Sequence, residues 1–194
     1  MKLFFLLFIA SLQCVAQDTV RVHIAHGSKP RKEYKEEYKT IGGFKGGHVV
    51  IEIDKLCYGF YFKENSIHLF PHNKTKNGVF QKQTLNEWNA IVKDKKVTTV
   101  YIPVSIIEKQ KLLAYYATNL KKPSCDYAFL GERCASNSYH QLKSIGKIQG
   151  GGYCFNAFYP AQLLRTILKQ NTLFNYKISV KQGSVKRKWE GDKL

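Results

Sequence analysis

Cys134 is the residue of this chain whose type and position most directly suggest chemistry. Behind it, apolar residues recur at steps of three and four, which is typical of one face of an α-helix: Ala135, Tyr139, Leu142 and Ile145. Gly146 supplies a stop signal, so we expect a helix that begins at Cys134. The free N–H groups and the dipole of a helix start favour a thiolate over a thiol. Cys134 is therefore a candidate nucleophile, and the alternative is an unreactive buried thiol.

A thiol nucleophile needs a base to accept its proton, and a histidine on a strand is a common choice. His48 opens the segment His-Val-Val-Ile-Glu-Ile53, whose composition predicts a strand. His48, Val50 and Glu52 would share one face. Glu52 lies roughly 13 Å from His48 along that strand, too far to orient the imidazole. His48 is the candidate base, and the alternative is an ordinary histidine at a strand end.

Two residues are candidates for the third member that would orient His48. A two-residue turn at Asp54-Lys55 would place Tyr61 opposite His48 on the next strand, about 5 Å away between Cβ atoms. A second tight turn at Glu64-Asn65 would place His68 next across the same face. The alternative for both is simple packing within the sheet.

The two segments together resemble a known family. Gly47-His48-Val-Val-Ile is followed, 86 positions after the histidine, by Leu-Gly-Glu-Arg-Cys134-Ala-Ser. This resembles the NlpC/P60-like branch of the papain-like cysteine hydrolases, with the usual order of cysteine helix and histidine strand reversed. The likeness is therefore to the circularly permuted subgroup, which includes the lecithin-retinol acyltransferase type. Tyr127-Ala-Phe-Leu-Gly131 resembles the Tyr-x-x-Gly segment before the nucleophile there, with one residue more.

The resemblance implies an α+β papain-like fold, in which an antiparallel sheet packs against the helix that carries the cysteine. It implies that Cys134 is the nucleophile and His48 the general base. The backbone N–H of Cys134 and the Tyr127 hydroxyl would stabilise the oxyanion. Family third members are commonly His, Asn, Gln or Glu, and neither Tyr61 nor His68 is a familiar third member at its position.

The reaction implied is attack on an amide or ester carbonyl through a thioester, on a peptide, glycopeptide or acyl substrate such as a cell-wall peptide. We expect neither a cofactor nor a metal, because no cysteine spacing resembles a zinc ribbon and His68 and His72 flank Pro71 off any helix. Two alternatives stay open. One is a non-catalytic envelope-binding domain on the same scaffold, and the other is a lipid acyltransferase or thioesterase.

The remaining elements can be predicted from their patterns. We expect strands over residues 18–25, 56–62, 66–70 and 97–104, and a closing hairpin of 174–180 with 184–190. Capping boxes at Thr84 and Ser105 predict two helix starts, and Pro160 opens a third helix. Residues 28–40 are rich in Lys and Glu, which favours an exposed loop or a short solvated helix.

The first residues predict export. A basic end, an apolar run and small residues near Ala16 are typical of a signal peptide over residues 1–16. Residues 17–194 are then expected to form one domain in the periplasm or outside the cell. No other apolar run has the length of a membrane span, so we expect no integral membrane segment after cleavage.

The chain is strongly basic. Its net charge is +17, and removal of a leader whose one charged residue is Lys2 leaves +16. Export argues against nucleic acid as a partner, whereas anionic envelope polymers, acidic lipid headgroups or acidic peptides would be attracted. The alternative is a basic surface that only keeps the protein in solution.

Four cysteines follow the leader, at positions 57, 125, 134 and 154. If Cys134 is free, one intramolecular bridge remains possible, and Cys125 with Cys154 would join the flanks of the central helix. Such a bridge would stabilise the fold by roughly 3 to 4 kcal/mol. The alternative is that these thiols are unpaired.

Overall fold

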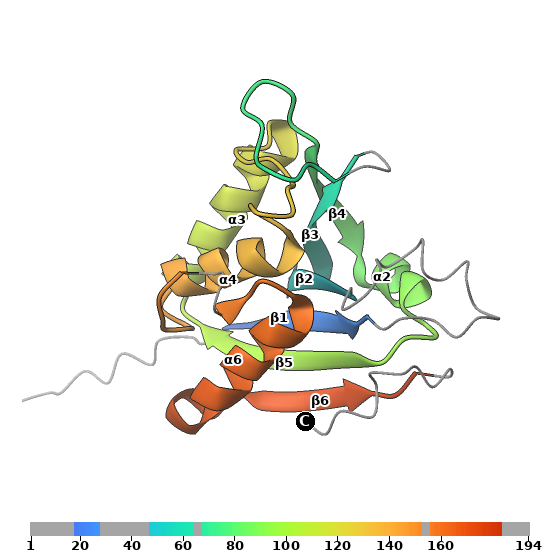
Figure 1. Cartoon of the computed structure of the whole chain (residues 1–194). Coiled ribbons are helices and arrows are strands. Elements are labelled where there is room, and N and C mark those ends of the chain that lie inside the picture. Colours follow the sequence, from blue (N-terminus) through green and yellow to red (C-terminus); the bar gives the residue numbers. More distant parts are fainter. Residues whose placement is uncertain (1–17, 28–46, 64–66, 153–155, 184–194) are drawn as a thin grey trace, which may run out of the picture.

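The computed structural model describes residues 18–27, 47–63, 67–152 and 156–183. These residues form an α+β fold with one six-stranded antiparallel sheet and four helices (Figure 1). The strands are β1 (Asp18–His26), β2 (Gly47–Ile53), β3 (Leu56–Phe62), β4 (Gly78–Thr84), β5 (Val97–Val104) and β6 (Lys177–Lys181). The helices are α2 (Leu85–Ile91), α3 (Ile106–Lys121), α4 (Cys134–Ser144) and α6 (Pro160–Phe174). The strand order is β4-β3-β2-β1-β5-β6.

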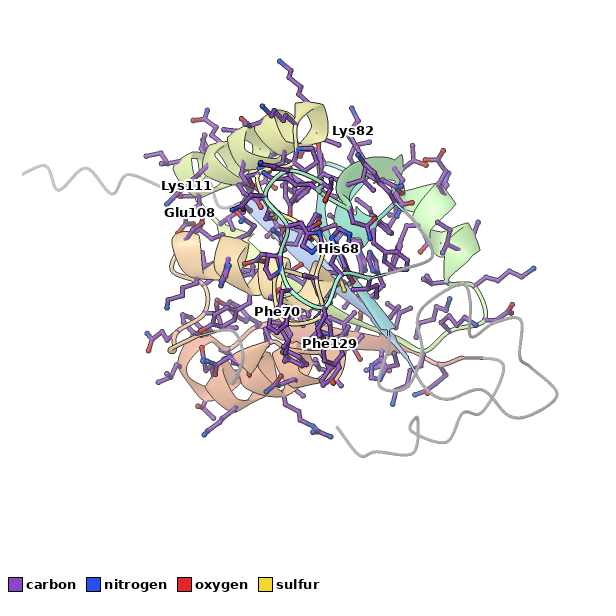
Figure 2. The ribbon with its side chains drawn as sticks, turned by 45° about the horizontal axis from the view of Figure 1, so that its top comes forward. His68, Phe70, Lys82, Glu108, Lys111 and Phe129 are labelled. Atoms are coloured by element: carbon purple, nitrogen blue, oxygen red, sulfur yellow. The ribbon has the colours of Figure 1, made fainter. Side chains whose placement is uncertain are left out.

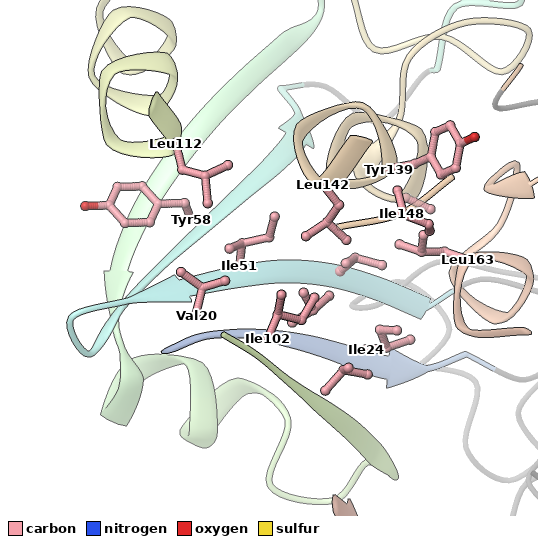
Figure 3. Packing of buried hydrophobic residues seen from close by; sticks show 14 of the residues in the cluster. Val20, Ile24, Ile51, Tyr58, Ile102, Leu112, Tyr139, Leu142, Ile148 and Leu163 are labelled. Atoms are coloured by element: carbon pink, nitrogen blue, oxygen red, sulfur yellow. The ribbon is translucent and has the colours of Figure 1, made fainter. Parts of the chain in front are cut away.

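The helices cover the two faces of the sheet unequally. Three of them, α3, α4 and α6, lie on one face, and the short α2 lies on the other (Figure 1). The large core fills the first side, where Leu112 of α3 and Leu142 of α4 pack over the strands (Figure 3). Trp88 of α2 and Val50 of β2 belong to a smaller cluster on the second side.

Strand β2 divides its side chains between these two cores. Val49, Ile51 and Ile53 lie in the large core, which also holds the buried face of α4. Val50 lies in the small core with Trp88, and a strand alternates its side chains, so His48 is on the α2 side of the sheet. Strand β2 and helix α4 are therefore in direct contact, but the His48 side chain leaves β2 on the face of the sheet opposite to α4.

The local signals that mark turns and helix ends are confirmed. Asp54 and Lys55 both have positive φ, 52° and 65°, as a tight two-residue hairpin requires. Thr84 and Ser105 both form complete capping boxes with the glutamates three residues later. Pro160 starts α6, and Gly146 follows α4 with a φ of 71°.

The strand expected over residues 66–70 is wrong. Residues 67–76 form a loop, and the fourth strand of the sheet is β4, which pairs with β3 from Leu56↔Thr84 to Phe62↔Gly78. The side chains explain the choice, because Phe80 of β4 stacks on Phe60 of β3 at 4.5 Å within the large core. Ile67, Leu69 and Phe70 are all exposed, so residues 67–70 bury no large apolar side chain.

Some other expectations involve residues outside the described part of the chain. β6 confirms the first strand of the closing hairpin, but it pairs with β5, and residues 184–190 lie outside the described part. Residues 1–16 and 28–40 lie outside it as well. Cys125 is a free thiol, so the expected bridge to Cys154, itself outside the described residues, is not formed by Cys125. None of the described helices has the length and apolar character needed to cross a membrane.

Candidate functional site

Cys134 occupies the first turn of α4, as its sequence pattern predicts. Arg133 precedes the helix with extended backbone angles, and its N–H donates to Ser136 Oγ at 2.7 Å, which fixes the first turn. Tyr139 and Leu142 are fully buried in the large core and hold the helix against the sheet. The Cys134 side chain is consequently 4% exposed.

The sulfur lies where strands β2 and β3 separate. Pairing between these strands ends at Val50↔Gly59, although β2 begins at Gly47 and β3 continues to Phe62. The next backbone N–H of β2, that of Val49, donates to the sulfur of Cys134 instead. Because the sulfur occupies the gap between two strands, it is near the residues of β2 and β3 that flank this gap.

Four groups around the sulfur favour its charged form. The Tyr127 hydroxyl donates to Sγ at 3.8 Å, the backbone N–H groups of Val49 and Ala135 also donate to it, and the Arg133 cation is nearby. Burial has the largest effect, however, and raises the pKa of Cys134 above its ordinary value. The expectation that the helix start yields a resting thiolate is therefore wrong, because desolvation outweighs the helix end. The resting group is a neutral thiol.

His48 presents a buried ring nitrogen beside this gap. Its ring stacks on Tyr61 with centroids 4.2 Å apart and lies 6.1 Å from the Trp88 ring. Nε2 is buried and has no hydrogen-bond partner among the described residues. Burial lowers the pKa of His48 to about 4, so the imidazole is neutral at physiological pH. A neutral imidazole with a free nitrogen can accept a proton.

Tyr61 lies opposite His48, as the two-residue turn at 54–55 predicts. Gln83 of β4 donates to the Tyr61 hydroxyl at 3.1 Å, which holds the phenol in place from the neighbouring strand. Burial, and then the proximity of Cys134, raise the pKa of Tyr61, so the phenol stays neutral. Tyr61 therefore orients the His48 ring by stacking, without a charge.

His68 is not part of this group, and its expected place beside Tyr61 is wrong. It lies in the loop of residues 67–76, where Nδ1 contacts Asp126 Oδ2 at 2.7 Å and the ring stacks on His72 at 4.0 Å. The reason is that the described residues 67–70 form no strand, and the expected position depended on one.

Glu52 is engaged elsewhere, in agreement with its predicted distance from His48. Its two carboxylate oxygens contact Arg21 at 2.5 Å and His23 at 2.8 Å. Glu52 and His23 are buried and Arg21 is partly exposed, and this polar cluster is centred four strand residues from His48. Glu52 therefore does not orient His48.

Sequence reasoning missed two contributors to the site. Arg133 is buried against three aromatic rings, with its guanidinium carbon 3.8 Å from the Phe158 centroid, and it donates to the Phe158 carbonyl. Gln83 positions Tyr61 from β4, a strand that the sequence pattern did not identify. The sequence signal for Arg133 was its place directly before Cys134, and the sequence signal for Gln83 was only the alternation of residues 78–84.

The group assembled at the gap is suited to acyl chemistry. It combines a sulfur, a neutral imidazole with an unpaired nitrogen, a phenol and backbone N–H donors at a helix start. Among the described residues no group of three or more His, Cys, Asp or Glu side chains is arranged to hold a metal ion. Comparisons of the chain with models of protein families, with curated proteins and with solved structures found no match.

Proposed function

We propose that this protein is an exported thiol hydrolase that cleaves amide or ester bonds on a circularly permuted, NlpC/P60-like papain scaffold. Cys134 is the nucleophile, His48 the general base, and Tyr61 the residue that orients His48. The observation that carries the proposal is the hydrogen bond from the Val49 N–H to the Cys134 sulfur, because Val49 directly follows His48 on β2.

The reaction begins from two neutral groups. The thiol proton passes to Nε2 of His48 as the sulfur attacks the carbonyl carbon, so charge separates only when the substrate is present. The oxyanion that forms accepts hydrogen bonds from the backbone N–H of Cys134 and from the Tyr127 hydroxyl, which is 3.8 Å from the sulfur. The leaving amine or alcohol takes the proton from His48, and water hydrolyses the thioester with the same base.

The substrate class follows from charge and location. A cell-wall peptide or glycopeptide, or an acyl group, would meet an exported catalyst, and a net charge of +17 for the full chain attracts anionic envelope polymers. Export rests on the predicted signal peptide of residues 1–16. Nucleic acid is not a partner in this proposal.

The test is acylation of the intact protein. We would incubate it with peptidoglycan peptides and with short-chain thioesters, and follow the mass of the protein and the release of products. Wild-type protein should gain an acyl group on Cys134 and release product, and Cys134→Ala should do neither while it keeps the same unfolding midpoint. Cys125→Ala removes another free thiol and is the matched control, which should behave as wild type.

Two results would contradict the proposal. One is turnover by Cys134→Ala equal to that of wild type. The other is a wild-type thiol that neither acylates nor reacts with iodoacetamide across pH, whereas the unfolded chain does react. The second result would favour a non-catalytic envelope-binding domain, which the 4% exposure of Cys134 and the raised pKa of its thiol also suit.

An acyltransferase or thioesterase is the second candidate reaction. Exposed Phe129 and Leu130 lie two and three residues after Tyr127 and would suit an acyl chain near the sulfur. Preference for thioesters over peptides in the acylation assay would identify this chemistry, with the same nucleophile.

A further inference from the structure

Exposed apolar side chains gather on two adjacent loops and the end of β3, next to the candidate site. We call them the apolar tip, and they come from the end of β3, the loop of residues 67–76 and the turn after Tyr127. Its members are Phe62, Ile67, Leu69, Phe70, Phe129 and Leu130, each between 39% and 60% exposed. They are six of the eleven large apolar residues exposed in the described part of the chain, so exposure is concentrated here.

Backbone contacts hold the two loops together. Phe129 N–H donates to His68 O at 2.7 Å, and Leu130 N–H donates to Leu69 O at 2.9 Å. Figure 2 shows Phe70 and Phe129 beside one another at this end of the molecule. Residues 68–69 are therefore bonded to residues 129–130, while the large side chains of both loops remain exposed.

Asp126 anchors the first loop from beneath. It accepts from the backbone N–H groups of His72 at 2.8 Å and Asn77 at 2.6 Å, and its carboxylate contacts the His68 ring at 2.7 Å. Burial alone would raise the pKa of Asp126, but these three hydrogen bonds lower it below its ordinary value. An ionised, fully bonded carboxylate thus fixes the loop in the conformation that exposes its apolar side chains.

Positive charge surrounds the apolar tip. Exposed lysines lie at positions 63, 74, 121 and 122, and Lys76 donates to the carbonyls of Pro123 and Ser124 between the loops. Asp126 is the one acidic residue in segments 67–76 and 121–131, and it is buried. The surface at this end is therefore apolar at its centre and cationic around it.

We infer that the apolar tip docks on a bilayer that contains anionic phospholipid. Leu69, Phe70 and Phe129 would enter the boundary between headgroups and acyl chains, and the lysines would contact phosphate groups. A second copy of this chain fits less well, because a twofold contact through the tip would bring the same lysines face to face. Docking in this way would place the Tyr127 turn next to the lipid surface, and the Tyr127 hydroxyl lies 3.8 Å from the Cys134 sulfur.

Vesicle binding of the purified mature protein tests the inference. Co-sedimentation would be measured with vesicles of phosphatidylcholine alone and of phosphatidylcholine mixed with phosphatidylglycerol. We expect binding to the mixed vesicles that weakens with added salt. The double variant Leu69→Ser/Phe70→Ser should bind about tenfold more weakly or worse. Lys74→Glu should lose about fivefold or more on the mixed vesicles.

Matched variants separate the tip from general exposure. Ile107→Ser/Leu173→Ser removes two other apolar side chains, which are 78% and 71% exposed and lie on helices away from the tip, and it should bind as wild type. Cys134→Ala should also bind as wild type, because docking does not depend on catalysis. An unchanged unfolding midpoint in the tip variant would exclude misfolding.

Four results would overturn the inference, and the first three concern vesicle binding and self-association. They are the absence of wild-type binding to mixed vesicles, equal binding by the tip variant and its control, and concentration-dependent self-association that the tip variant abolishes while vesicle binding is unaffected. Binding of an apolar peptide at the tip without vesicle binding would also overturn it, in favour of a peptide partner.

Discussion

Acid should lower the unfolding free energy of this protein through protonation of His48. Burial lowers the pKa of His48 from its ordinary 6.5 to about 4 in the folded chain. The unfolded chain therefore binds a proton first as the pH falls, so stability is complete above pH 6.5 and decreases until the pH reaches about 4. Between about pH 7 and about pH 4.5 this linkage costs about 2.5 kcal/mol of unfolding free energy.

The perturbation is His48→Gln, which removes the titrating ring. Urea unfolding of wild type and variant, followed by tryptophan fluorescence at both pH values, gives two losses of stability on acidification. The loss should be about 2.5 kcal/mol smaller in the variant, since every other titrating group is common to both chains. Ile107→Ser, an exposed substitution that removes no titrating group, should keep the wild-type loss.

Equal acid losses in wild type and His48→Gln would refute the reasoning, because His48 would then not be desolvated. A larger acid loss of stability in the variant than in wild type would also refute the reasoning. It would mean that the pKa of His48 is raised, as it would be in a resting thiolate–imidazolium pair with Cys134. The sign of the difference thus distinguishes the neutral pair from the ion pair.

Three further changes have outcomes that follow from the contacts. Asp126→Asn leaves the loop above it with weakened acceptors and should lower the unfolding free energy by about 2 to 3 kcal/mol in denaturant titrations. Tyr127→Phe removes the hydroxyl 3.8 Å from the Cys134 sulfur and should slow acylation roughly tenfold to a hundredfold at unchanged stability, and an unchanged rate would exclude an oxyanion role. Gly131→Ala sets a Cβ 2.6 Å from a proline ring and should cost about 1 to 3 kcal/mol, whereas Gly151→Ala meets no atom within 4 Å and should leave the thermal midpoint nearly unchanged.

Sequence reasoning located the parts of the site that depend on short-range patterns. The spacing behind Cys134 identified α4, and the turn at Asp54-Lys55 set the register that places Tyr61 opposite His48. Both depend on residues close in the chain, where periodicity and turn chemistry act directly.

The predictions that were wrong depend on contacts between residues far apart in the sequence. Whether residues 66–70 or 78–84 pair with β3 was decided by the stacking of Phe80 on Phe60, a contact no local pattern contains. The position of His68 depended on that choice, and its true partner Asp126 is 58 residues away. The protonation of Cys134 depended on burial by the assembled core, which outweighs the helix start.

The gap between β2 and β3 also makes a backbone amide an indicator of the chemical state of the sulfur. Val49 N–H takes no part in the β2–β3 ladder there, because its acceptor is the sulfur of Cys134. Alkylation or oxidation of that sulfur would change the electronic environment of this amide proton. The nitrogen–proton resonance of Val49 would therefore move when the thiol is modified, and its exchange with deuterated solvent would report the reaction without any substrate.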